Sequence, residues 1–194
     1  KAQDWMSDST KQAALDKLAS FYVKIGYPNA WKDLSALNID PAKSYYENVQ
    51  ACREFWDKFY IEKNAGKPVD REEWFMTPQT VNAYYNPTTN EICFPAGILQ
   101  YPFFDPKSDD AFNYGAIGVV IGHEMTHGFD DQGRHYDKEG NMTDWWTESD
   151  GKNFVERTSK YADFFSKIKV LPDLNANGEL TLGENLADHG GLQV

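Results

Sequence analysis

The sequence predicts an α+β fold that is mainly helical, with a short antiparallel sheet and flanking helices. Its 194 residues are enough for one good-sized domain or two small ones. Four segments place apolar side chains at helical spacing: residues 8–25, 41–63, 110–129 and 148–168. Residues 80–85 and 91–95 are short runs of strand-forming residues separated by turn formers, which is typical of two paired strands.

The first two predicted helices have apolar faces that indicate packing roles. Asp8 or Ser9 can cap the start of the first helix, and the Gly-Tyr-Pro sequence at residues 26–28 ends it. Pro41 suits the first turn of the second helix, and Asn-Ala-Gly at residues 64–66 ends that helix. Nothing in either helix points to chemistry.

The remaining elements follow from turn formers and caps. Residues 86–90, Asn-Pro-Thr-Thr-Asn, form the predicted turn between the two strands. Residues 130–141 are rich in Asp, Gly and Asn, which predicts a loop. Thr147 or Ser149 could cap the helix expected at residues 148–168.

The helix at residues 110–129 contains His123-Glu124-Met125-Thr126-His127, which fits the H-E-x-x-H pattern of zinc peptidases. Residues four apart lie on one face of a helix, so the two imidazoles can be directed at one metal ion. Glu124 then lies beside the metal, where it can accept a proton from a metal-bound water. The alternative is a buried helix whose histidines only form hydrogen bonds.

The residues before the motif leave the type of segment open. Apart from one glycine, residues 117–121 are all apolar, which predicts a segment surrounded by protein. Their β-branched side chains would also suit a short buried strand. We favour a helix because only a helix makes both histidines converge. Gly115, Gly118 and Gly122 would then form one stripe that lets another backbone approach closely.

A third metal ligand is available near the end of the chain, in the sequence Gly183-Glu-Asn-Leu-Ala-Asp188. Glu184 can complete a His₂Glu zinc site and leave the fourth position for water. Asp188 lies one helical turn further on, where it can accept the free N–H of a ligand imidazole. The alternative is that Glu184 belongs to a capping box with Thr181.

Two other classes of site fit less well. A metzincin needs a glycine at position 130 and a histidine at position 133, where this chain has Asp130 and Gly133. The 30 acidic residues outnumber the 19 basic ones, a net charge of −11, which disfavours binding to nucleic acid or to an anionic membrane surface. The sequence contains no membrane span.

Cys52 and Cys93 could form one disulfide, but two free thiols are the more common arrangement.

Three blocks together resemble the neprilysin-like family of zinc endopeptidases, which includes neprilysin, endothelin-converting enzyme and bacterial oligopeptidases. Val81-Asn-Ala-Tyr-Tyr85 resembles the substrate-binding strand of the family, His123–His127 its zinc helix, and Gly183–Asp188 its third-ligand helix. The resemblance is close over about residues 74–194 and looser over the N-terminal helices. It implies a zincin (thermolysin-like) catalytic core.

At the matching positions, the resemblance implies one zinc ion per chain, bound by His123, His127 and Glu184. Glu124 would be the general base and would later carry the proton to the leaving amine. Asp188 would be a second catalytic-site residue that hydrogen-bonds to a zinc ligand, His123 by analogy.

The resemblance also implies an oligopeptide substrate. Asn82 and the backbone of Ala83 would hold an extended peptide alongside the strand, which is β-strand addition in physical terms. The alternative is an ordinary edge strand.

A catalytically inactive zinc- and peptide-binding module is a second possible function, although the intact Glu124 argues against it. Hydrolysis of a non-peptide substrate is a third, and the strand argues against that. The sequence does not indicate the oligomeric state.

The chain also departs from the family. Family members carry a histidine and an arginine further along that contact the substrate, and a large second lobe, and neither appears before Val194. We therefore expect residues 1–194 to be part of a catalytic domain, with a helical portion at 1–70 and the site at 74–194, and to be weakly active or inactive alone. The disulfide pattern of vertebrate members is not visible, which points to a bacterial relative. Such relatives are typically exported, which implies an extracytoplasmic location (periplasmic, cell-surface or secreted).

Overall fold

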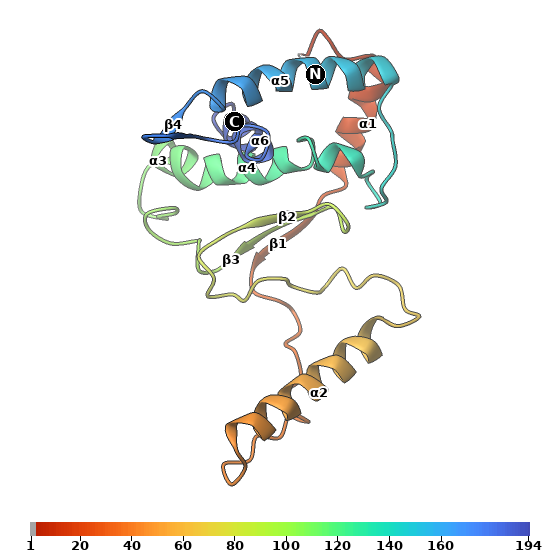
Figure 1. Ribbon diagram of the computed structural model, residues 1–194, viewed down its shortest axis with the longest axis vertical. Helices are drawn as coiled ribbons and strands as arrows, with labels where there is room; N and C mark the ends of the chain where they lie inside the picture. Colours follow the sequence, from red (N-terminus) through yellow and green to blue (C-terminus); the bar gives the residue numbers. More distant parts are fainter. Residues whose placement is uncertain (1–2) are drawn as a thin grey trace. The chain divides into compact units, whose positions relative to one another are not determined.

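The computed structural model describes residues 3–194, and the chain divides into two compact units (Figure 1). The larger unit contains the chain up to residue 27 together with residues 76–194, and the smaller unit is residues 28–75. Both are rich in helix, and the larger unit also carries a small sheet. The predicted α+β, mainly helical class is confirmed.

The sheet of the larger unit has three strands in the order β1-β3-β2. Strands β2 (Tyr84–Asn86) and β3 (Glu91–Pro95) are the predicted antiparallel pair, with Tyr84 opposite Cys93. Strand β1 (Tyr22–Gly26) was not predicted and runs parallel to β3. The sheet is therefore mixed, and β2 lies at one edge of it.

The prediction of one helix over residues 8–25 was wrong in its last third, residues 20–25. Helix α1 (Asp8–Ala19) is capped by Ser7, whose side chain accepts from the Thr10 amide, and it ends at Ser20. Apolar residues at 18, 21, 22 and 25 fit a helical period, but residues 22–25, Tyr-Val-Lys-Ile, also include an aromatic and two β-branched residues, which suit a strand. Pairing with the buried strand β3 decided between these two patterns, because it satisfies the backbone of both strands.

The segment before the motif is helical, as predicted. It consists of α3 (Asp110–Asn113), a π-helical turn (Tyr114–Gly118) and α4 (Val119–His127). The segment is less enclosed than expected: Ile117 is buried, whereas residues 119–121 are only half-buried.

Helix α6 (Leu182–Gly191) lies between α4 and α5 (Glu148–Phe165) in Figure 1 and contacts both. The approach to α4 is close at Gly122, where an added Cβ would lie 2.9 Å from the Gly191 Cα. The expected backbone contact is therefore present at Gly122. It is absent at Gly115, where an added Cβ meets no atom within 4 Å, and at Gly118, which faces only its own helix.

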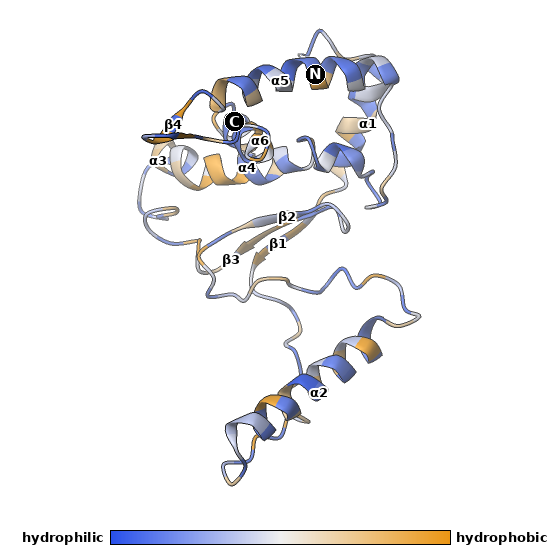
Figure 2. Cartoon of the chain, viewed as in Figure 1, coloured by the Kyte–Doolittle hydropathy of each residue, from blue (hydrophilic) through white to orange (hydrophobic). Residues whose placement is uncertain are grey.

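The hydrophobic core lies between the sheet and α4. Figure 2 shows the first half of α4 as hydrophobic and the motif end as more hydrophilic. The buried core residues are Ala83, Ile92, Phe94, Ile98 and Ile117, and the half-buried residues around them include Val120, Ile121 and Met125. The core thus fixes α4 against the sheet with its motif end toward β2.

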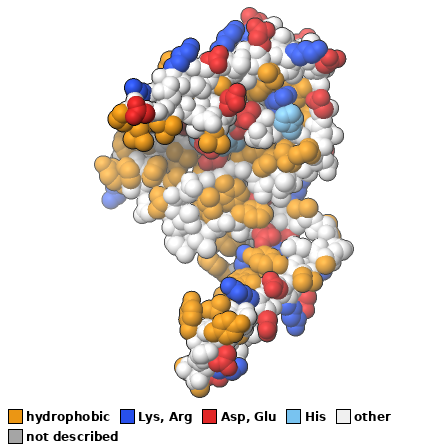
Figure 3. Space-filling model, viewed as in Figure 1, with side chains coloured by type: hydrophobic (Ala, Val, Ile, Leu, Met, Phe, Trp, Pro, Cys, Tyr) orange, Lys and Arg blue, Asp and Glu red, His pale blue; other side chains and the backbone are white. Residues whose placement is uncertain are grey.

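The other elements of the larger unit connect these parts. A 3₁₀ turn (Gly133–His135) lies in the predicted loop after α4, and β4 (Lys169–Leu171) pairs with β5 (Leu174–Asn175) in a short ribbon. Helix α5 is capped by Thr147 and ends three residues earlier than predicted, where the chain turns toward β4. Large hydrophobic side chains are also exposed in the structure, and Figure 3 shows them on the surface of both units.

The smaller unit contains α2 (Tyr45–Asn64). It begins four residues later than predicted, at a capping box formed by Ser44 and Glu47, which satisfies two backbone N–H groups at the helix start. Both cysteines are free; Cys93 is buried in β3 and Cys52 is half-buried.

Candidate metal centre

Three potential metal ligands converge at the end of α4 that faces the sheet. The Nε2 atoms of His123 and His127 lie 2.9 Å apart. Oε2 of Glu184, from α6, lies 3.4 Å from His123 Nε2 and 3.7 Å from His127 Nε2. Ligands of one zinc ion lie closer together than about 4.4 Å, twice the longest usual zinc–ligand distance. All three distances meet this limit, so two imidazoles and one carboxylate could bind one zinc ion here.

Glu124 lies next to these ligands and is only 6% exposed. Burial raises the pKa of its carboxyl above the usual range, and the neighbouring imidazoles and the Tyr85 backbone act in the opposite direction. A carboxylate with a raised pKa accepts a proton more readily than an ordinary glutamate does.

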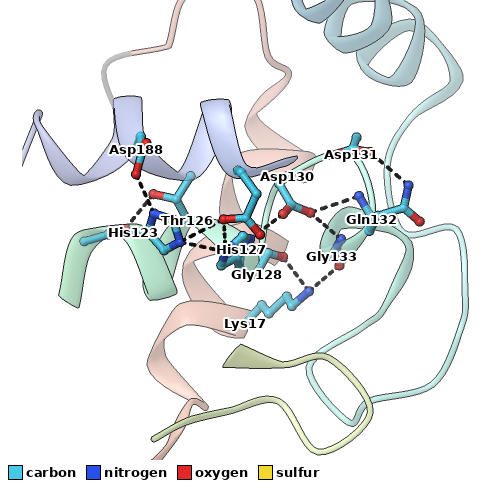
Figure 4. Close-up of polar contacts among 12 residues, drawn as sticks. Lys17, His123, Thr126, His127, Gly128, Asp130, Asp131, Gln132, Gly133 and Asp188 are labelled. Atoms are coloured by element: carbon cyan, nitrogen blue, oxygen red, sulfur yellow. Dashed lines mark hydrogen bonds and ion pairs between the residues drawn. The ribbon is translucent and has the colours of Figure 1, made fainter. Parts of the chain in front are cut away.

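Asp188 makes the contact that its spacing predicted. Its Oδ1 lies 2.9 Å from Nδ1 of His123 (Figure 4). A carboxylate in this position accepts the Nδ1–H, so Nε2 is left as the ligand atom. Asp188 itself is exposed, with 74% of its side chain accessible.

A second carboxylate, Asp130, plays the same part for the other histidine, and sequence reasoning missed it. Asp130 Oδ2 lies 2.7 Å from Nδ1 of His127, and the Asp130 side chain is only 6% exposed. Burial alone would lower the pKa of His127, but the hydrogen bond and charge of Asp130 raise it overall. A signal was available, because Asp130 follows His127 by three residues at the point where the helix ends.

The capping-box interpretation of Glu184 is wrong. Thr181 is the N-cap of α6, but its side chain makes no capping hydrogen bond. Instead its hydroxyl donates to the Asn177 carbonyl and accepts from the Asn185 side chain. The Glu184 carboxylate is therefore directed to the histidines and not to the start of its own helix.

The ligands line a cavity of about 680 Å³. Its wall also includes Asn82, Ala83, Tyr84 and Tyr85 from the sheet side, and Asp130 to Gly133 from the turn after α4. Asn82 and Ala83, expected on a strand, precede β2, which begins at Tyr84. The Ala83 amide donates to the Asn82 side chain at 2.9 Å, because the chain bends here before it pairs with β3.

Two histidines four residues apart on one helix, a glutamate from a second helix and a glutamate beside them form the arrangement expected of a zincin. Comparison with known proteins agrees with this class. The sequence profile of peptidase family M13 matches residues 82–194. The chain therefore belongs to peptidase family M13.

Individual relatives are similar over almost the whole chain. Neprilysin-1 of Caenorhabditis elegans is 43% identical over 99% of this chain and 26% of its own length. Human endothelin-converting enzyme 1 is 44% identical over 98% of this chain and 25% of its own length. This chain thus spans about a quarter of the length of the curated relatives that it matches.

Solved structures give the same result. The zinc metalloprotease ZMP1 of Mycobacterium tuberculosis, in complex with an inhibitor, superposes with a TM-score of 0.86 at 49% identity, covering 98% of this chain and 30% of that one. PepO of Lactobacillus rhamnosis superposes with a TM-score of 0.88 at 38% identity, covering 97% and 30%. Among the described residues, no helix is both long and apolar enough to cross a membrane.

Proposed function

We propose that this chain is part of a zinc-dependent endopeptidase that hydrolyses peptide bonds in oligopeptides. The observation that carries the proposal is the convergence of His123, His127 and Glu184, from two helices, with Glu124 beside them. Membership of a peptidase family supports it, and so do relatives whose names state zinc metalloprotease activity. Residues 1–194 would together be part of the catalytic domain.

The donor set suits one zinc ion per chain. Imidazole nitrogens and a carboxylate oxygen are the ligands of catalytic zinc, and three protein ligands leave a position for water or substrate. Zinc bound by such a set acts as a Lewis acid on the scissile carbonyl and lowers the pKa of a water molecule. Asp188 and Asp130 would each fix one histidine in the tautomer that presents Nε2.

Glu124 would move the protons of the reaction. Its buried carboxylate would accept a proton from the attacking water and later deliver it to the leaving amine. The raised pKa of Glu124 suits the first step, because a more basic carboxylate accepts the proton of the water more readily than an ordinary glutamate does.

The substrate would be an extended peptide alongside the outer edge of β2. A peptide can add to the edge of a sheet as a further strand. Asn82 and Ala83 line the cavity at this edge. Because the Ala83 amide already donates to Asn82, the peptide would be left the Ala83 carbonyl and the Asn82 side-chain N–H groups. We further propose an extracytoplasmic location, from the resemblance to the family alone. The net charge of −11 argues against a nucleic-acid partner.

The proposal is tested by separating chemistry from metal binding. In the full-length protein that contains this chain, Glu124→Gln should keep zinc and reduce cleavage of an unstructured peptide by at least about 100-fold, the contribution of a positioned general base. His123→Ala combined with His127→Ala should lose the zinc. Zinc retained undiminished by the double variant would refute the ligand assignment. Near wild-type cleavage by Glu124→Gln would refute the role of Glu124. Zinc and peptide binding without turnover in the unaltered protein would favour the inactive binding module instead.

A further inference from the structure

Lys17, in the last turns of α1, is among the most deeply buried side chains of the described chain, with 1% of its surface exposed. Its Nζ donates to three backbone carbonyl oxygens: Gly128 at 2.7 Å, Gly133 at 2.8 Å and Tyr136 at 2.7 Å. Figure 4 shows the bonds to Gly128 and Gly133. An ammonium group has three N–H donors, so all three are used. A residue more than a hundred positions away in sequence thus binds the turn that follows the motif helix.

The three carbonyls bracket Asp130. Gly128 is the C-cap of α4, directly after His127, and Gly133 begins the 3₁₀ turn. Between them, Asp130 Oδ1 accepts from the amides of Gln132 at 2.9 Å and Gly133 at 2.7 Å. Its other oxygen lies 2.7 Å from His127 Nδ1. Lys17, the turn, Asp130 and the imidazole are therefore linked by consecutive hydrogen bonds.

The turn is also packed tightly against the helix end. A Cβ added at Gly133 would lie 1.8 Å from the His127 carbonyl oxygen, so only glycine fits there. The carbonyls at the end of a helix carry partial negative charge and lack partners within the helix. The Gly133 oxygen also accepts from the Tyr136 amide at 3.1 Å, and the Tyr136 oxygen accepts from the Trp145 indole at 2.9 Å. Without Lys17, the Gly128 oxygen would lose its bond to the ammonium, and three partly negative oxygens would face one another with no cation between them.

A cation suits this position for two further reasons. Lys17 Nζ lies 5.5–5.8 Å from the ring centroids of Tyr85, Phe129 and Trp145, within the range of cation–π attraction. The second reason is the pair of nearby carboxylates, Asp130 and Asp137. Burial lowers the pKa of Lys17, but these carboxylates favour its charged form, and the pKa is about 8. Lys17 therefore still carries its charge at neutral pH.

We propose that Lys17 is a positioning residue for the His127 side of the metal centre: its ammonium fixes the turn that carries Asp130, and through Asp130 the orientation of the His127 imidazole. This inference rests on the proposed zinc site only where zinc affinity is concerned. The geometry of the turn is a property of the chain itself.

The test compares two substitutions, each of which removes a contact at a different end of α1. Lys17→Met keeps the length and apolar stem of the side chain and removes its three donors. Asp150→Asn is the matched control, because Asp150 accepts from Ser7 and Thr10 and so attaches the other end of α1 to the start of α5. Two readouts are measured for both variants at neutral pH: zinc affinity by chelator competition, and hydrogen exchange of the Gly133 amide in the zinc-free protein.

We expect Lys17→Met to weaken zinc binding by about 10–100-fold, as for loss of other groups behind a metal ligand, and to speed Gly133 exchange by at least tenfold. Asp150→Asn should change neither zinc affinity nor Gly133 exchange, even if it lowers the melting temperature as much as Lys17→Met does. Equal effects of the two variants, or unchanged Gly133 exchange in Lys17→Met, would overturn the proposal.

Lys17→Arg provides a second variant if Lys17→Met does not fold. It keeps the charge but replaces a compact ammonium with a planar group, so a smaller loss in both readouts is expected. Failure of both variants to fold would assign Lys17 a purely structural role and overturn the proposal. If the unaltered chain binds no zinc through His123 and His127, the proposed function fails, but Gly133 exchange still decides whether Lys17 fixes the turn.

Discussion

The two histidines of the metal centre have the same kind of partner in opposite surroundings. On the His123 side, the partner is Asp188, which is largely exposed on α6; on the His127 side, it is Asp130, which is buried in the turn after α4. A hydrogen bond between charged or partly charged groups is stronger where water is excluded. The His127 side should therefore be the more rigid half of the centre.

The two sides also differ in how they are built. His127 and Asp130 belong to one continuous segment, and both oxygens of Asp130 are occupied. Asp188 comes from a helix some sixty residues later, and its position depends on the packing of α6 against α4. One side is thus set mainly by local structure and a buried cation, and the other by contact between two helices. The difference predicts how each side responds to mutation.

The largest effect is expected from Gly190→Val, which acts on the side built by helix packing. An added Cβ at Gly190 would lie 1.9 Å from the Thr126 hydroxyl oxygen, which itself donates to the Gly122 carbonyl. Helix α6 must then shift, and Glu184 and Asp188 move with it. Because a ligand and its neighbour are lost together, zinc affinity should fall by more than about 100-fold, as measured by chelator competition.

Gly115→Ala is the control for this substitution, because an added Cβ there meets no atom within 4 Å. It should leave zinc affinity unchanged and the melting temperature equal or slightly higher, since alanine suits a helix better than glycine does. A zinc affinity in Gly190→Val equal to that of Gly115→Ala would show that the position of α6 does not limit metal binding.

Asp130→Ala should have the next largest effect. It removes the buried partner of His127 and leaves the amides of Gln132 and Gly133 without their acceptor. Loss of zinc affinity near the upper end of the usual range, about 100-fold, is expected. The measurement is again chelator competition, with circular dichroism to establish that the variant is folded.

Asp188→Ala should weaken zinc binding less, by about tenfold, because water can replace an exposed carboxylate as the acceptor for His123 Nδ1. Comparing Asp188→Ala with Asp130→Ala tests most directly whether the buried His127 side of the centre is the stronger one. If Asp188→Ala costs more zinc affinity than Asp130→Ala, burial does not make the His127 side the stronger one.

The smallest effect on the site is expected from Asp150→Asn, which lies outside both sides. Hydrogen bonds from Ser7, Thr10 and Thr147 hold the pKa of Asp150 well below its usual range, although desolvation acts in the opposite direction. Since the pKa is lower in the folded state, this carboxylate stabilises the fold above the unfolded-state pKa of about 3.9, and the stabilisation is lost as the pH falls through its folded-state pKa.

Asp150→Asn should therefore lower the melting temperature at pH 7 by about 5 °C, from the loss of charge-assisted hydrogen bonds, and leave zinc affinity unchanged. The difference from the unaltered protein should narrow below about pH 4, because the Asp150 carboxylate then becomes protonated in the unfolded state while it stays charged in the folded state. A constant difference between pH 7 and pH 3 would show that the charge of Asp150 contributes nothing.

Several features of the centre follow from local sequence alone. Helical periodicity brings His123 and His127 to one face, and Glu124 beside them, wherever this helix forms. The pairing of β2 with β3 follows from strand-forming residues around a short turn. Asp130 could also have been found, because a carboxylate three residues after a helical histidine, at the end of the helix, lies within reach of its ring. In each case the interacting groups are a few residues apart, so backbone geometry sets their distance.

Other features were decided only by the tertiary structure. Residues 22–25 fit both a helix and a strand, and contact with β3 selected the strand. The approach of α6 to α4 depends on Gly122, Gly190 and Gly191, whose opposition across two helices no local pattern reveals. Lys17 looks like an ordinary solvent-facing lysine of an amphipathic helix, yet it is buried against three carbonyls of a distant turn. The physical reason is that periodicity reports how a segment divides between core and solvent, whereas a buried charge is placed by acceptors that come together only when distant segments pack.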